Sequence, residues 1–279
     1  FAGEHTDKIV CVAASALAVG EDGGAVEVIF TAGFDGKIKI WSLESRVCIH
    51  SLNVSSQDSR ISSICVCGDA GQYLASARGG VGVVEVWDLH RIACRICEGN
   101  AHSCFKDCSL TSLWSHTSAI RCLQPLPMHD SNILCIASGS HDLSVRVWKI
   151  KILEAKEQDT GELLPDDPPA YFHEAIVICM ASANITDSDA QALGTHVLLV
   201  STSNDGVCKV WDPVNKCMVR TIIPPSNLPA PLAIACSSGS KPCLVVTTRL
   251  HHLELELARK AGKQPRSSLV MYDLFSGEI

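Results

Sequence analysis

The chain has 279 residues, of which 47% are hydrophobic and 19% are charged, and its formal net charge is -7. This composition excludes a disordered chain, because disorder accompanies low hydrophobicity and high net charge. The acidic balance also argues against a nucleic-acid surface spread over the whole domain, since phosphate binding depends mainly on Lys and Arg. No run of about 18 apolar residues is present, so the sequence predicts no membrane span.

The 15 cysteines could indicate a disulfide framework, which is typical of short secreted chains. Most of them instead lie in predicted strands among Val and Ile, where a thiol behaves as a small apolar side chain. The cysteine pattern therefore predicts buried free thiols and a reducing compartment, either cytoplasmic or nuclear.

A β-hairpin that ends on an aromatic residue recurs along the chain. The first copy runs from Phe34 to Trp41, with Asp35-Gly36 at its turn, and a further short strand follows near Cys48. An earlier strand around Cys11 comes six residues after His5. The first unit, about residues 1–56, is therefore predicted to contain four strands.

Four more units repeat this order. We place them approximately at residues 57–113, 114–170, 171–226 and 227–279, and their hairpins end at Trp87, Trp148, Trp211 and Tyr272. The third hairpin, Ile133 to Ile150, is the clearest. The second unit has Arg78-Gly79-Gly80 where others have the turn Asp, so we expect it to be the least regular. The spacing of the Trp residues exceeds a basic repeat of roughly 40 to 45 residues, which predicts insertions.

These motifs resemble the WD40-repeat β-propeller family over nearly all of the chain. The resemblance implies an all-β propeller domain over residues 1–279 with five recognisable four-stranded blades. We expect it to be truncated at both ends and to belong to a larger, seven-bladed propeller. The family also implies that one set of residues forms a buried structural network in each repeat. The set comprises His5, Asp35, Trp41, Trp87, His116, Ser138, Asp142, Trp148, His173, Ser201, Asp205, Trp211 and Tyr272.

A cysteine-rich stretch follows the second hairpin, and Cys94, Cys97, His102 and Cys108 have nearly the spacing of a zinc knuckle. The last gap is one residue too long, and Cys94 follows Trp87 at the offset that separates Cys48 from Trp41. We therefore favour an ordinary strand residue at Cys94, a structural loop between blades, and no metal or cofactor. A zinc-binding loop is the alternative.

Two insertions are strongly charged. The stretch from Lys151 to Pro169 includes Glu162, Asp166 and Asp167, and its prolines predict a solvated acidic loop that is also a candidate partner site. The stretch from Arg249 to Arg266 interrupts the fifth hairpin. Its cations are candidates for contact with an acidic partner or with RNA phosphate, and they are Arg259, Lys260, Lys263 and Arg266.

No catalytic motif stands out, and His and Asp residues that recur in successive units do not read as one active site. The sequence therefore predicts no enzyme, but a scaffold that binds other proteins within a complex. Nucleic acid is expected only indirectly or through the basic insertion. The segment from Ile133 to Ile223 is also similar to the WD-repeat subunit of the complex that matures the large ribosomal subunit, which gives pre-ribosome maturation as an alternative.

Overall fold

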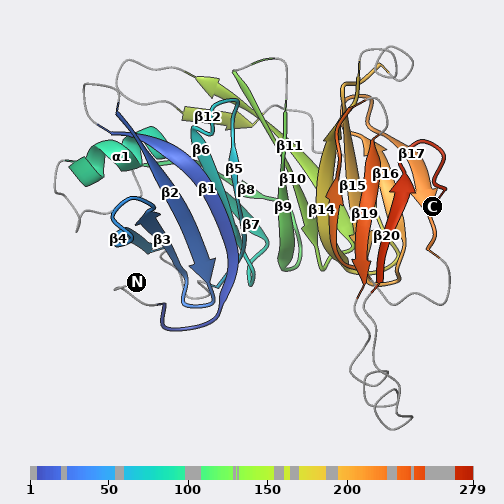
Figure 1. The fold of residues 1–279 in the computed structure, drawn as a ribbon, viewed down its shortest axis with the longest axis horizontal. Coiled ribbons are helices and arrows are strands. Elements are labelled where there is room, and N and C mark those ends of the chain that lie inside the picture. The colour runs from blue at the N-terminus through green and yellow to red at the C-terminus, as the bar shows by residue number, and fades with distance from the viewer. Residues whose placement is uncertain are drawn as a thin grey trace, which may run out of the picture. The chain divides into compact units, whose positions relative to one another are not determined.

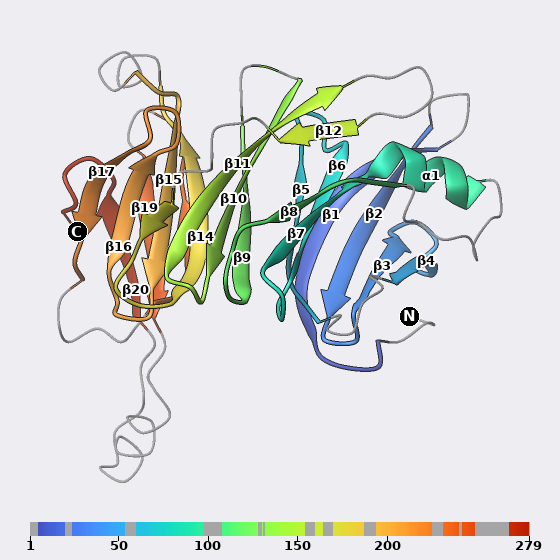
Figure 2. The same cartoon turned by 180° about the vertical axis from the view of Figure 1, so that it is seen from behind.

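The computed structural model describes residues 5–19, 24–53, 60–97, 108–127, 130, 132–153, 160–163, 170–186, 194–224, 231–239, 242–248 and 268–278. Within these ranges the chain forms strands β1 to β20 and one α-helix, α1 (Figures 1 and 2). The strands make five antiparallel sheets. The predicted all-β class with five sheets is confirmed.

The first sheet has the predicted four strands in sequence order. They are β1 (Ile9–Val19), β2 (Gly24–Gly33), β3 (Lys37–Ser42) and β4 (Cys48–Asn53). In β2, Val28, Phe30 and Ala32 are fully buried while the residues between them are only partly buried, because alternate side chains of a strand point to opposite faces. The Asp35-Gly36 turn needs its glycine, since Gly36 has a φ of 70°.

The second sheet is also four-stranded, and it corrects the interpretation of the cysteine-rich stretch. Its strands are β5 (Ile61–Cys67), β6 (Tyr73–Arg78), β7 (Val83–Asp88) and β8 (Ser109–Trp114). Helix α1 (Leu89–Cys97) lies between β7 and β8. The insertion therefore joins the third and fourth strands, and our placement of it between blades was wrong. Cys94 is a helix residue and not the strand residue that we predicted.

The third sheet contains the predicted hairpin and a longer extension. Its strands are β9 (Ile120–Leu126), β10 (Ile133–Ser140), β11 (Ser144–Leu153), β12 (Thr160–Leu163) and β13 (Ala170–Phe172). Both β12 and β13 pair with β11. The prediction of an irregular acidic loop from Lys151 onward was therefore wrong in part. Backbone pairing of residues 150–153 with residues 160–163 makes a two-stranded arm, which we call the β11–β12 arm.

The last two sheets follow the same order. The fourth sheet has β14 (Val177–Asn184), β15 (Val197–Ser203), β16 (Cys208–Asp212) and β17 (Cys217–Ile222). The fifth has three strands within the described residues, which are β18 (Pro231–Cys236), β19 (Cys243–Thr248) and β20 (Ser268–Asp273). The basic insertion separates β19 from β20, and it lies outside the described residues. The second sheet repeats the strand order of the first and fourth, and it differs from them by the helix between its third and fourth strands.

The chain divides into two compact units, and the division passes through the β10–β11 hairpin. Unit 1 comprises residues 1–138 and 147–168, and unit 2 comprises residues 139–146 and 169–279. In unit 1, one apolar core joins the first and second sheets with α1, and another joins the second and third sheets. In unit 2, the core lies between the fourth and fifth sheets. Each core fills the space between neighbouring sheets, which is the packing expected of stacked repeats.

Candidate functional site

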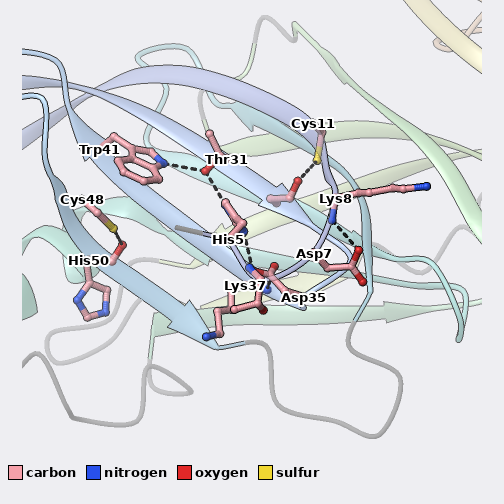
Figure 3. A network of polar contacts seen from close by, with 12 residues as sticks. His5, Asp7, Lys8, Cys11, Thr31, Asp35, Lys37, Trp41, Cys48 and His50 are labelled. Atoms are coloured by element: carbon pink, nitrogen blue, oxygen red, sulfur yellow. Dashed lines mark hydrogen bonds and ion pairs between the residues drawn. The ribbon is translucent and has the colours of Figure 1, made fainter. Parts of the chain in front are cut away.

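A chain of hydrogen bonds connects four side chains in the first sheet (Figure 3). Trp41 Nε1 donates to Thr31 Oγ1 at 2.7 Å, and Thr31 Oγ1 lies 2.8 Å from His5 Nε2. His5 Nδ1 lies 2.7 Å from Asp35 Oδ2. The His5 and Asp35 side chains are only 2% and 1% exposed. The network therefore ties the chain before β1 to β2, to β3 and to the hairpin turn.

The groups that can only donate a hydrogen bond set the direction of the bonds in this network. The indole N–H can only donate, so Thr31 accepts from Trp41 and can donate its own hydroxyl proton to Nε2 of a neutral His5. His5 then donates its Nδ1 proton to the Asp35 carboxylate. Burial alone would raise the pKa of Asp35, but hydrogen bonds from His5 and from the backbone N–H groups of Thr6 and Lys37 outweigh burial and lower this pKa. The carboxylate is thus fixed by structural hydrogen bonds.

The same arrangement recurs in the third and fourth sheets. Trp148 Nε1 donates to Ser138 Oγ at 2.8 Å, and Ser138 Oγ lies 2.7 Å from His116 Nε2. In the fourth sheet, Trp211 Nε1 donates to Ser201 Oγ at 2.7 Å, and His173 Nε2 lies 2.7 Å from that oxygen. Both serines are completely buried.

The second sheet keeps half of this network and shows what sequence reasoning missed. Trp87 Nε1 donates to Ser76 Oγ at 2.9 Å. Neither Ser76 nor Thr31 was predicted. A signal existed, because the hydroxyl residue lies 10 residues before the Trp in three sheets and 11 residues before it in this one.

The turn aspartates hold the hairpins. Asp142 Oδ1 accepts from the backbone N–H and the hydroxyl of Ser144 at 3.0 and 2.6 Å. Asp205 Oδ1 accepts from the Val207 N–H at 2.8 Å and from the Ser203 hydroxyl. Carboxylates commonly bond to backbone N–H groups two residues ahead in tight turns. In the fifth sheet, Tyr272 takes the Trp position and is buried, and its hydroxyl has no hydrogen-bond partner among the described residues.

Thr31, His5 and Asp35 have the spacing of a nucleophile, a general base and an orienting acid. The Thr31 oxygen already accepts the indole proton of Trp41, and the imidazole and the carboxylate are shielded from solvent. A nucleophile must reach a substrate atom, whereas the related Ser138 and Ser201 hydroxyls are inaccessible. These groups therefore stabilise the hairpins and are not placed for catalysis.

His173 provides a test of this structural role. Burial, and to a smaller extent Lys209, lowers the pKa of His173 to about 4. The unfolded chain binds a proton near the ordinary value, so the stability that neutral His173 contributes is lost as the pH falls from about 6.5 toward about 4. We expect His173→Gln to flatten the acid side of the pH profile of unfolding by no more than about 3 kcal/mol. Denaturant titrations across this range measure the slope. Equal slopes in wild type and His173→Gln would contradict this role.

The predicted zinc ligands do not come together. Cys108 is 1% exposed and belongs to the core of unit 1, whereas Cys94 and Cys97 are exposed on α1. His102 lies outside the described residues. Within the described ranges, no group of three or more His, Cys, Asp or Glu side chains is arranged to hold a metal ion.

The charged candidates are only partly placed. Glu162 lies on β12 opposite Lys151. The other candidates fall outside the described residues, and they are Asp166, Asp167, Arg259, Lys260, Lys263 and Arg266. No helix in the described part of the chain is long and apolar enough to cross a membrane.

Comparison with known proteins identifies the repeats. The family model for the WD domain, G-beta repeat (WD40) matches residues 107–149 and 173–212. The matched segments contain the networks that end at Trp148 and Trp211. The chain therefore contains WD40 repeats. WD40 propellers are generally not catalytic, and they typically bind other proteins.

A solved structure described as "Structure of U3-55K" resembles this chain with a TM-score of 0.54 and 16% sequence identity. The alignment covers 88% of this chain and 62% of that one, so our chain spans less than two thirds of the length of the solved protein. In all, 1036 solved chains match. A likeness this widespread and this low in identity shows the fold and does not select a function.

Proposed function

We propose that this WD40-repeat protein is a non-catalytic scaffold that binds partner proteins within a larger assembly. The proposal rests on what the recurrent His, hydroxyl and Trp side chains do. In the first, third and fourth sheets the His, the hydroxyl residue and the Trp bond to one another, so these side chains serve the fold. We therefore expect partner proteins to bind to the surfaces and insertions of the repeats.

One end of unit 1 is the best candidate for a partner surface. Helix α1 and the β11–β12 arm both follow the third strand of their sheets, and both lie at this end of the unit (Figures 1 and 2). Strand β12 also contacts β8 of the second sheet. Elements added to a repeat at one end can recognise a partner without disturbing the core.

A reducing compartment, cytoplasm or nucleus, is part of the proposal. The cysteines that the structure describes are free thiols. Burial raises the pKa values of Cys11, Cys135, Cys208 and Cys236 to about 12, so these thiols stay protonated and unreactive at neutral pH. This supports packing as the role of the cysteines and does not call for disulfide formation.

The scaffold proposal is tested by affinity purification of the full-length parent protein from its own cells, followed by mass spectrometry. We expect one reproducible set of bound proteins. Charge reversal on the acidic insertion, Glu162→Lys with Asp166→Lys and Asp167→Lys, should deplete part of that set. Asn204→Lys, in an exposed hairpin turn of the fourth sheet, is the control and should retain it. Recovery of chaperones alone by the wild-type protein would contradict the scaffold.

Pre-ribosome maturation through RNA contact at Arg259, Lys260, Lys263 and Arg266 is the second candidate, and it rests on the sequence alone. It predicts binding of RNA that weakens steeply with salt and disappears when these residues are changed to Glu. RNA binding that survives this change would exclude the basic insertion as its site.

A further inference from the structure

Helix α1 is held in one orientation on unit 1. Asp88 caps its first turn, because Asp88 Oδ1 accepts from the backbone N–H groups of His90 and Arg91 at 2.8 and 3.1 Å. Leu89, Ile92 and Ala93 are buried in the core between the first and second sheets. The apolar face is thereby fixed inward, and the side chains of the opposite face are held at the surface.

Three metal-ligating side chains lie on that outer face. His90, Cys94 and Cys97 are all exposed. At about 100° per residue, the spacings of four and three residues place them within a stripe of about 60° around the helix axis. An exposed stripe of one imidazole and two thiols allows a metal ion to enter from solvent.

The first two of these side chains already have the separation that zinc requires. Cys94 Sγ lies 3.6 Å from His90 Nε2. Bonds of about 2.3 Å from zinc to sulfur and about 2.0 to 2.1 Å from zinc to nitrogen, at a tetrahedral angle, put the two ligand atoms about 3.6 Å apart. A helical His and Cys four residues apart can thus take two corners of a tetrahedral site without movement of the backbone.

As they lie in the structure, these three side chains are not yet arranged around one ion. We propose that His90 and Cys94 of α1 bind a zinc-class divalent ion and that Cys97, one turn further along, moves to supply a third ligand. Cys97 reaches the ion by a change of side-chain rotamer, which is available to an exposed residue. Binding replaces the S–H bond of each ligating thiol with a metal–sulfur bond, and the proton passes to the buffer. Water or a partner side chain completes the shell. This ligand set differs from the zinc-knuckle set, because Cys108 is buried and takes no part.

The test uses the reduced 279-residue chain, with Zn²⁺ followed by calorimetry and Co²⁺ followed by its sulfur-to-metal charge-transfer absorption. We expect saturable binding of one ion, and at least about a tenfold loss of affinity in His90→Ala and in Cys94→Ala. Cys94→His retains a ligand at the same helix position. It should therefore keep most of the Zn²⁺ affinity while the Co²⁺ charge-transfer band weakens.

Matched controls change residues of the same types elsewhere on the surface. Cys217→Ala on β17 and His141→Ala in the β10–β11 turn should leave binding unchanged. Thermal unfolding monitors the fold, which the exposed positions on α1 should not disturb. No binding to the wild-type chain, or equal affinity in His90→Ala and wild type, would overturn the proposal and leave the Cys94 and His90 contact as a hydrogen bond only.

Discussion

Trp148→Ala is expected to lower the free energy of unfolding by about 3 to 5 kcal/mol, because it removes a large side chain from a close-packed core. Trp148 is 1% exposed and packs between the second and third sheets. Its ring meets the edge of the His116 ring at a centroid distance of 6.1 Å, and its Nε1 donates to Ser138. The substitution leaves a cavity and also removes the donor that Ser138 uses.

Trp114→Ala is the matched control, because Trp114 lies at the end of β8 and is 66% exposed. Its described contact is with the Arg78 guanidinium, whose carbon lies 5.9 Å from the centre of the Trp114 ring. The Trp114 ring is exposed, and a cation–π contact at an exposed ring is worth about 0.5 to 1 kcal/mol, so we expect a loss of no more than about 1 kcal/mol. Urea unfolding measures both variants. Similar losses for Trp148→Ala and Trp114→Ala would show that Trp148 is not packed as described.

Arg78→Leu is expected to destabilise the protein by about 3 to 5 kcal/mol, because it leaves a carboxylate without its partner in a largely buried position. Arg78 Nη2 and Glu85 Oε1 are 2.5 Å apart, and the two side chains are 8% and 13% exposed. Arg78 ends β6 of the second sheet, whose turn lacks the usual Asp. In the first, third and fourth sheets, an aspartate accepts hydrogen bonds within the corresponding turn.

The effect of Arg78→Leu should depend on pH. Burial raises the pKa of Glu85, and Arg78 counteracts this by lowering it, so loss of Arg78 raises the pKa of Glu85 further. A carboxyl whose folded pKa is raised stabilises the fold at low pH and loses that contribution as the pH rises through the folded value. The penalty should therefore shrink as the pH falls through the raised pKa of Glu85.

The double variant Arg78→Leu with Glu85→Leu distinguishes the effect of an unpaired Glu85 carboxylate from the effect of lost packing around Arg78. Leucines of similar volume carry no charge that needs a partner, so the double variant should recover most of the stability lost in Arg78→Leu. Chemical unfolding of the three proteins gives the coupling energy. A double variant as unstable as Arg78→Leu would mean that the loss comes from packing and not from the unpaired Glu85 carboxylate.

The hairpins were predictable because their signals are local. The turn Asp, the alternating strand and the closing Trp lie within a few residues of one another, as at Asp35 and Trp41, and the third and fourth units repeat all of them. The network partners Thr31 and Ser76 were harder to find, since Ser and Thr are common and only their distance from the Trp marks them. The cation and carboxylate of Arg78 and Glu85 gave no sequence signal at all.

Helix α1 and the β11–β12 arm were not predictable, because their local patterns suit more than one structure. Leu89, Ile92 and Ala93 form a helical apolar stripe, but Cys94 also fits the strand position set by Cys48 in the first unit. Burial of this stripe between the first two sheets stabilises the helix over the strand. In the arm, the charges and prolines after Lys151 favour a loop, and pairing of β12 with β11 makes part of it a strand.

Residue patterns alone were enough to identify the repeat, its five units, the hairpins and the aromatic residues that close them, because each pattern lies within one unit. The three-dimensional arrangement was needed to show which residues complete the buried networks, where the insertions leave the sheets, and which cysteines are covered. These features depend on contacts between segments far apart in the chain, such as those that bury Cys108 in the core and leave Cys94 at the surface. The free energy of such contacts comes from burial, which no local pattern encodes.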